Sequence, residues 1–169
     1  MFFSEFGSTQ LKPWGADGIF DEDFVERWET ELSPGNPNVV GAALWTFNDY
    51  RSTWRGTPPT GFRTWGVVDE HRNIKPAYYT IRKLFSPVRE LKVEGRTVTV
   101  HIRSSNEIPS YALRGYKLVW EAGEQSGELP LPDLHPDDPA WQAELPVPGA
   151  TVQLVSPLGY DVDDTINRF

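Results

Sequence analysis

The chain has 169 residues, of which 38% are hydrophobic and 13% aromatic, and its formal net charge is −8 at pH 7. This length suffices for one or two domains, and the acidic surplus argues against nucleic acids and anionic membrane surfaces, which bind Lys and Arg. No apolar run is long enough to span a bilayer. Cysteine is absent, and the three histidines have no ligand spacing, so neither a metal site nor another cofactor is expected.

The first half of the chain predicts an alternation of strands and helices. Phe2 and Phe3 form an apolar stub, typical of the end of a buried strand, and a loop rich in Pro and Gly follows. Asp21–Leu32 has helical periodicity with an acidic start, which suits the positive end of the helix dipole. Val39–Phe47 is apolar nearly throughout, as in a strand that is covered on both faces of a parallel sheet. After a long loop, Pro76 is suited to the first position of a second helix.

The pattern changes after Pro87. Thr97–Ser105 alternates apolar and polar residues with a period of two, and several further short strands follow, separated by Gly and Pro. Such spacing favours a β-sandwich of the immunoglobulin or fibronectin kind. We therefore expect two domains, 1–86 and 87–169.

Three motifs in the first half resemble one known family. They are SEFG at 4–7, LWTFND at 44–49 and GVVDEHRNIKPAY at 66–78. In this order and spacing they resemble the C-terminal part of the glycoside hydrolase family 2 enzymes, which include β-galactosidases, β-glucuronidases and β-mannosidases. The resemblance covers about half of the chain, from Phe2 to about Phe85.

The resemblance implies a fold class: α/β plus all-β, with the last two βα units of a (β/α)8 TIM barrel followed by the sandwich. A whole barrel takes about 250 residues, so the barrel portion would be incomplete. The general acid/base glutamate of the family would then lie upstream of Met1. We leave Glu107 unassigned, although it follows Asn106, because it falls in a predicted turn of the β-rich half. The uncovered strand edges predict either a partner that carries the upstream barrel portion or self-association.

The resemblance also implies a function, that of a retaining, β-galactosidase-like glycosidase acting on O-glycosyl bonds. Glu5 matches the catalytic nucleophile of the family. Retaining hydrolysis uses two carboxyl groups about 5–5.5 Å apart, so we expect the chain alone to be inactive.

Other residues are predicted to contact the carbohydrate substrate. Trp45 is interpreted as a platform under a sugar ring, the alternative being a core tryptophan. Asn48 and Asp49 follow it, and for Asp49 a structural cap and a substrate contact are equally favoured. Arg51 and Trp65 lie in the long loop, with Trp54 and Arg55; this group suits a carbohydrate or an anionic sugar, and equally suits packing against an upstream domain.

The loop also bears on the sugar. β-Glucuronidases hold the uronate with an Asn-x-Lys motif, which RGTPPTGFRTWG (55–66) lacks. This favours a galactosidase-like or mannosidase-like enzyme, while the arginines leave an acidic or sulfated sugar open. The sugar, the linkage, the oligomeric state and the compartment stay open, although the resemblance is compatible with a periplasmic or secreted parent.

The alternative function is a carbohydrate-binding or structural β-sandwich without catalytic activity. Tyr111, Tyr116, Trp120 and Trp141 are the aromatic residues available for binding a sugar. The alternation places Tyr116 and Trp120 on one side with Leu118, which indicates core.

Overall fold

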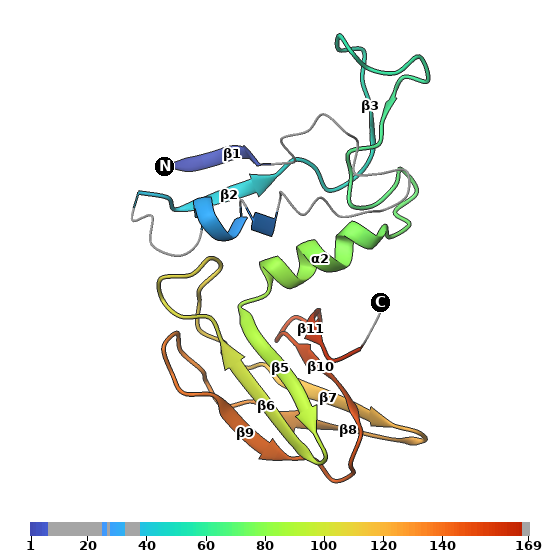
Figure 1. Ribbon diagram of the computed structural model, residues 1–169. Helices are drawn as coiled ribbons and strands as arrows, with labels where there is room; N and C mark the ends of the chain where they lie inside the picture. The colour runs from blue at the N-terminus through green and yellow to red at the C-terminus, as the bar shows by residue number, and fades with distance from the viewer. Residues whose placement is uncertain (7–24, 27, 33–37, 167–169) are drawn as a thin grey trace. The chain divides into compact units, whose positions relative to one another are not determined.

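The computed structural model describes residues 1–6, 25–26, 28–32 and 38–166 (Figure 1). The chain divides into two compact units, Met1–Leu84 and Phe85–Phe169. Strands make up 40% of the structure and helices 11%, so the chain is predominantly β.

The predicted fold class is therefore wrong. Of the two helices in the described residues only one reaches seven residues, which is too little helix for TIM-barrel units. The predicted helix Asp21–Leu32 lies partly outside the described residues, as does the loop before it, and its described end is the five-residue π-helix η1, Trp28–Leu32.

The second predicted strand, Val39–Phe47, is also much shorter than expected. β2 covers only Gly41–Leu44, because the backbone beyond it pairs with a different segment. Phe47 O accepts a hydrogen bond from Val68 N, and Val68 O accepts one from Asp49 N, both at 3.0 Å. An apolar run indicates burial but does not determine where its backbone groups find their partners.

The first unit contains a parallel pair of strands. β1, Phe2–Phe6, lies beside β2, with Phe2 opposite Gly41 and Phe6 opposite Leu44 (Figure 1). The buried Phe6 ring meets the Trp28 ring edge to face at 5.9 Å, which packs η1 against the pair.

A short hairpin and one α-helix complete the described part of this unit. β3, Tyr50–Arg51, and β4, Phe62–Arg63, pair in antiparallel fashion. The helix α2, Pro76–Phe85, begins at Pro76 as predicted and buries Ala77, Ile81 and Leu84.

The second unit consists of two antiparallel sheets. One is ordered β5-β6-β9 and the other β11-β10-β7-β8. The strands are β5 Val88–Glu94, β6 Thr97–Ile102, β7 Lys117–Ala122, β8 Gln125–Pro130, β9 Trp141–Glu144, β10 Thr151–Val155 and β11 Asp161–Asp164.

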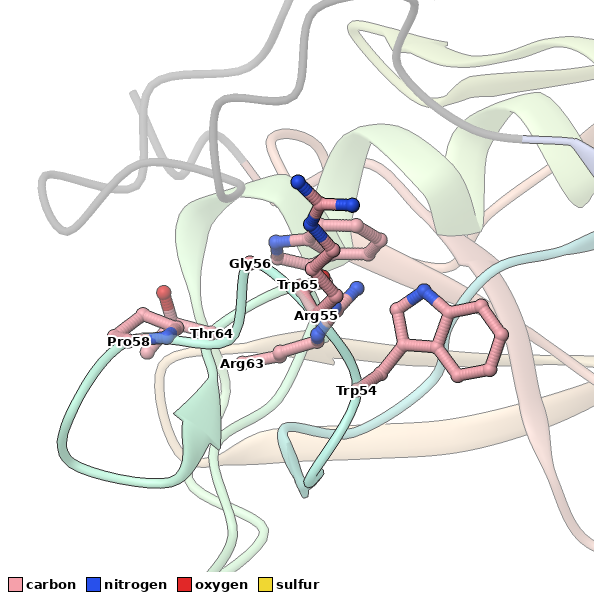
Figure 2. Close-up of a pocket in the computed structure, with 7 residues that line it drawn as sticks. All are labelled: Trp54, Arg55, Gly56, Pro58, Arg63, Thr64 and Trp65. Carbon is pink, nitrogen blue, oxygen red and sulfur yellow. The ribbon is translucent and has the colours of Figure 1, made fainter.

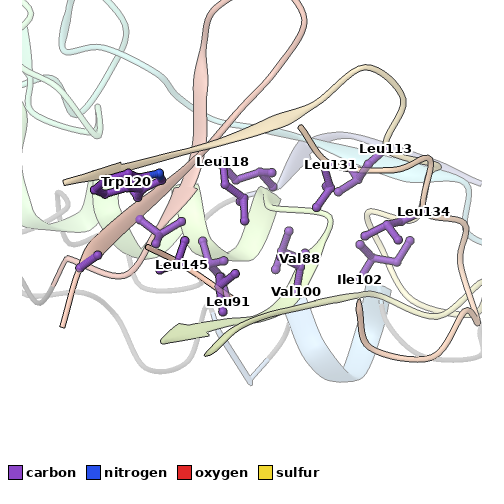
Figure 3. Packing of buried hydrophobic residues seen from close by; sticks show 14 residues of the cluster. Val88, Leu91, Val100, Ile102, Leu113, Leu118, Trp120, Leu131, Leu134 and Leu145 are labelled. Atoms are coloured by element: carbon purple, nitrogen blue, oxygen red, sulfur yellow. The ribbon is translucent and has the colours of Figure 1, made fainter. Parts of the chain in front are cut away.

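Side chains from both sheets form one hydrophobic core (Figure 3). Val88, Val98 and Val100 on one sheet, and Leu118 and Val152 on the other, have no exposed surface. A buried polar link joins the first and last strands of the unit, since Ser86 Oγ donates to Asp163 Oδ2 at 2.7 Å and accepts from Val88 N.

A glycine on β8 makes room for a core indole. Gly127 lies opposite Trp120, and a Cβ atom at this position would come 2.7 Å from Trp120 Cζ2. We expect Gly127→Ala to lower the free energy of unfolding of this unit by about 1–3 kcal/mol, because the ring must move within a packed core. Urea unfolding would measure this loss. Ser126→Ala, an exposed position on the same strand, should change stability by less than about 0.5 kcal/mol; equal losses would contradict the steric account.

Candidate functional site

Glu5 and Trp45 lie at the carboxyl ends of two adjacent strands. Glu5 is exposed near the end of β1, and Trp45 directly follows β2. Trp45 N donates a hydrogen bond to Phe6 O at 3.0 Å, so the backbones beside the two side chains are in direct contact. The parallel pairing of β1 and β2 thus brings together two residues that are forty positions apart in the sequence.

The Trp45 indole is oriented by the neighbouring hairpin. Its Nε1 donates to the Tyr50 hydroxyl at 3.2 Å, and the two rings meet edge to face with centroids 5.8 Å apart. With 41% of its surface exposed, Trp45 is not a core tryptophan. The peptide bond between Trp45 and Thr46 is cis.

Asp49 has protein partners for its carboxylate. It is only 4% exposed, and its Oδ1 accepts from Gly66 N at 2.8 Å and from Lys75 Nζ at 2.6 Å. This arrangement ties the segment after β2 to the segment before α2. It favours the structural role over substrate contact, the two alternatives left open by the sequence.

Asn48 and Arg51 flank this anchor. Asn48 Nδ2 donates to Asp49 O at 2.7 Å, and the exposed Arg51 guanidinium lies over the Phe62 ring at 4.7 Å. Their predicted substrate contacts stay predictions.

The loop between β3 and β4 is built from two defined turns. Thr57 N donates to Trp54 O in the first turn. Gly56 occupies its third position with a φ of +86°, a conformation that favours glycine. Gly61 N donates to Pro58 O in the second turn, which has proline in its favoured second position. Glycine and proline thus fix the loop through the local conformations that they permit.

This loop, together with β4 and the two residues after it, lines a pocket of about 300 Å³ (Figure 2). The indole rings of Trp54 and Trp65 and the guanidinium groups of Arg55 and Arg63 gather on one side of it, with Pro58 and Thr64 at the other end. Of the loop residues that the sequence suggested for a sugar, Trp54, Arg55 and Trp65 line this pocket and Arg51 does not. Arg63 was missed, although the arginines of the loop and their lack of acidic neighbours are visible in the sequence.

Arg63 is held in place within the pocket. Its guanidinium lies 4.7 Å from the Trp65 ring centroid, and it donates to Thr57 Oγ1 at 3.0 Å and to Arg55 O at 3.3 Å. None of these partners carries a negative charge, so no described residue neutralises its positive charge.

Glu107, which was left unassigned, has ion-pair and hydrogen-bond partners within the second unit. It is 7% exposed and forms ion pairs with Arg89 and Arg103. It also accepts hydrogen bonds from Ser104 N at 2.8 Å and Ser104 Oγ at 2.9 Å. A carboxylate with these partners holds the turn together and is poorly suited to donate a proton to a substrate.

Three of the four aromatic residues considered for sugar binding in the second unit pack in or against its core. Trp120 is buried, and Tyr116 and Trp141 pack against the core. Tyr111 is partly exposed, and burial together with the neighbouring Tyr116 raises its pKa to about 12. These residues do not form an exposed aromatic platform.

The described residues contain neither a cluster of metal-ligating side chains nor a membrane-spanning helix. No group of three or more His, Cys, Asp or Glu side chains in this part of the chain could hold a metal ion. Among the same residues, no helix combines the length and the apolar character that crossing a bilayer requires.

The comparisons with known proteins identify no relative. No protein-family model matches the chain, and no curated protein matches it. The function must therefore be argued from the site itself.

Proposed function

We propose that the chain is the nucleophile-bearing portion of a retaining, β-galactosidase-like glycosidase, with Glu5 as nucleophile and Trp45 as the platform under the sugar. The observation that supports this best is the pairing of β1 with β2. It puts an exposed carboxylate and a half-exposed indole at neighbouring strand ends, with Trp45 N bonded to Phe6 O.

The chemistry gives each of the two groups a role. In a retaining mechanism the carboxylate attacks the anomeric carbon, the glycosidic C–O bond breaks, and an acid protonates the departing oxygen. Water then hydrolyses the glycosyl ester and releases the carboxylate. A tryptophan face packs against the C–H groups of the sugar ring, and the bond from Trp45 Nε1 to Tyr50 holds that face in one orientation.

The acid/base carboxyl is proposed to come from a partner segment. Glu107 is engaged with Arg89 and Arg103, and Asp49 with Lys75. The alternative, a binding or structural β-sandwich, has less support because its aromatic residues Tyr116, Trp120 and Trp141 pack in or against the core.

The test is hydrolysis of an aryl β-galactoside. We expect no turnover by the chain alone, and turnover once the reading frame encoded upstream of Met1 is joined to it. Glu5→Gln in the joined protein should lower kcat by at least about 10³-fold, because no covalent intermediate can form. Glu26→Gln, an exposed glutamate of the same unit, is the matched control and should leave kcat unchanged. Activity retained by Glu5→Gln would refute the role of Glu5.

A further inference from the structure

We propose that the pocket formed by Trp54, Arg55, Arg63 and Trp65 binds an anionic sugar residue of the substrate, either a uronate or a sulfated hexose. This inference deepens the proposed function, on which it rests for the saccharide nature of the ligand. Its selectivity for a negative charge can be measured by binding alone.

The local charge of the loop favours an anionic ligand. Residues 50–68 include three arginines and no Asp, Glu or Lys, in a chain whose net charge is −8. Neither Arg55 nor Arg63 forms an ion pair with any described residue. Apart from the hydrogen bonds and the ring contact of Arg63 given above, neither side chain has a polar or ring contact with the described residues. A concentration of unneutralised positive charge on an acidic protein indicates a site for a negatively charged ligand.

The kind of cation and its orientation also favour an anionic ligand. A guanidinium presents a planar fork of donors that matches the oxygens of a carboxylate or a sulfate. Arg63 is already oriented by the Trp65 ring, Thr57 and Arg55 O. Arg55 lies in the second position of the turn from Trp54 to Thr57, so its backbone is fixed while its side chain is exposed.

The size and the apolar surface of the pocket suit a sugar ring. A volume of about 300 Å³ is at the lower limit of small-molecule pockets, which suits one sugar ring. Trp54 is 76% exposed and presents an indole face on which the C–H groups of such a ring could pack. A neutral sugar would use the indoles but give neither arginine a negatively charged partner.

A nucleic acid is the competing ligand with similar chemistry, since arginine and tryptophan also bind phosphates and bases. Single-stranded nucleic acids need a basic groove that extends over several nucleotides. Here the basic stretch is confined to one loop of an acidic chain, so the observations favour a single anionic sugar.

The test compares three probes on the intact chain. They are methyl β-galactoside, methyl β-galacturonide and methyl β-galactoside 6-sulfate, titrated while the tryptophan indole N–H signals are followed by NMR. Trp54→Phe and Trp65→Phe assign the two pocket signals. We expect either anionic probe to shift both signals, with an affinity at least about tenfold above that of the neutral probe and falling with added salt. The anionic probe that binds with the higher affinity identifies the preferred charged group as carboxylate or sulfate.

Arg55→Gln provides the decisive variant, because the Arg55 side chain supports no other described residue. It should lower the affinity for the preferred anionic probe by about tenfold, as expected for the loss of one charge-assisted contact. The affinity for the neutral probe should not change. Arg114→Gln removes the same charge from an exposed position in the second unit and should have no effect.

Three results would overturn the proposal: equal affinity for the charged and neutral probes, equal effects of Arg55→Gln and Arg114→Gln, or no shift of either indole signal at millimolar probe. Binding by the Glu5→Gln variant separates the two proposals. Because Glu5 does not line the pocket, this variant should bind the anionic probe normally even though the nucleophile is lost. If the pocket does not bind the anionic probes, the proposed role of Glu5 is likewise unaffected.

Discussion

Gly66→Ala is expected to destabilise the first unit by about 3 kcal/mol, at the upper end of the usual cost of overpacking. A Cβ atom at Gly66 would lie 2.3 Å from both Asn48 C and Asp49 N. These are backbone atoms, which cannot rotate away as a flexible side chain could. The two segments would have to separate, which would break the bond from Gly66 N to Asp49 Oδ1.

Hydrogen exchange over residues 47–50 and 66–68 would measure this effect directly, alongside thermal unfolding. Gly61→Ala is the control in the same unit. Gly61 has open space around its Cα but a φ of +74°, so its replacement should cost only the left-handed backbone strain of about 1–2 kcal/mol. Equal losses for both variants would mean that the close approach at Gly66 does not limit stability.

Asp49→Ala is expected to cost about 3–5 kcal/mol, the range for breaking a buried ion pair from one side. Removal of the carboxylate leaves Lys75, whose side chain is 18% exposed, without its ion-pair partner. It also deprives Gly66 N of its hydrogen-bond acceptor. Lys75→Met should cost less, because Asp49 would keep the hydrogen bond from Gly66 N.

Urea unfolding of both single variants and the double variant gives the coupling energy of the pair. Lys117 and Glu128 provide the comparison, since their side chains are 39% and 58% exposed. The exposed pair should couple by about 1 kcal/mol or less. A coupling between Asp49 and Lys75 that is no larger would contradict their role as an anchor.

Local patterns in the sequence predicted some elements well. Pro76 together with the apolar spacing that follows it predicted the start of α2, and the alternation after Thr97 predicted β6. These signals are confined to adjacent residues, so they do not depend on the rest of the fold. Glu5 and Trp45 were singled out by motif, whereas the parallel pairing that joins their backbones was implied only by the resemblance and not by the residue pattern.

Other features depend on contacts between distant residues and were missed or mistaken. β3 and β4 have two residues each, too few to show any periodicity. Asp49 and Lys75 are 26 positions apart, and neither residue type indicates the pairing. The barrel units were wrong because the described residues contain too little helix. The apolar run Val39–Phe47 was also read as one strand, whereas its last residue bonds to Val68.

The most direct test of the central claim is to identify the residue that becomes glycosylated. The chain joined to its upstream reading frame would be treated with an activated 2-deoxy-2-fluoro-β-galactoside, which slows release of the covalent intermediate, and then digested for mass spectrometry. The account predicts one fluorosugar adduct, carried by Glu5, together with loss of activity. An adduct on another carboxylate, or continued hydrolysis with Glu5 unlabelled, would contradict it.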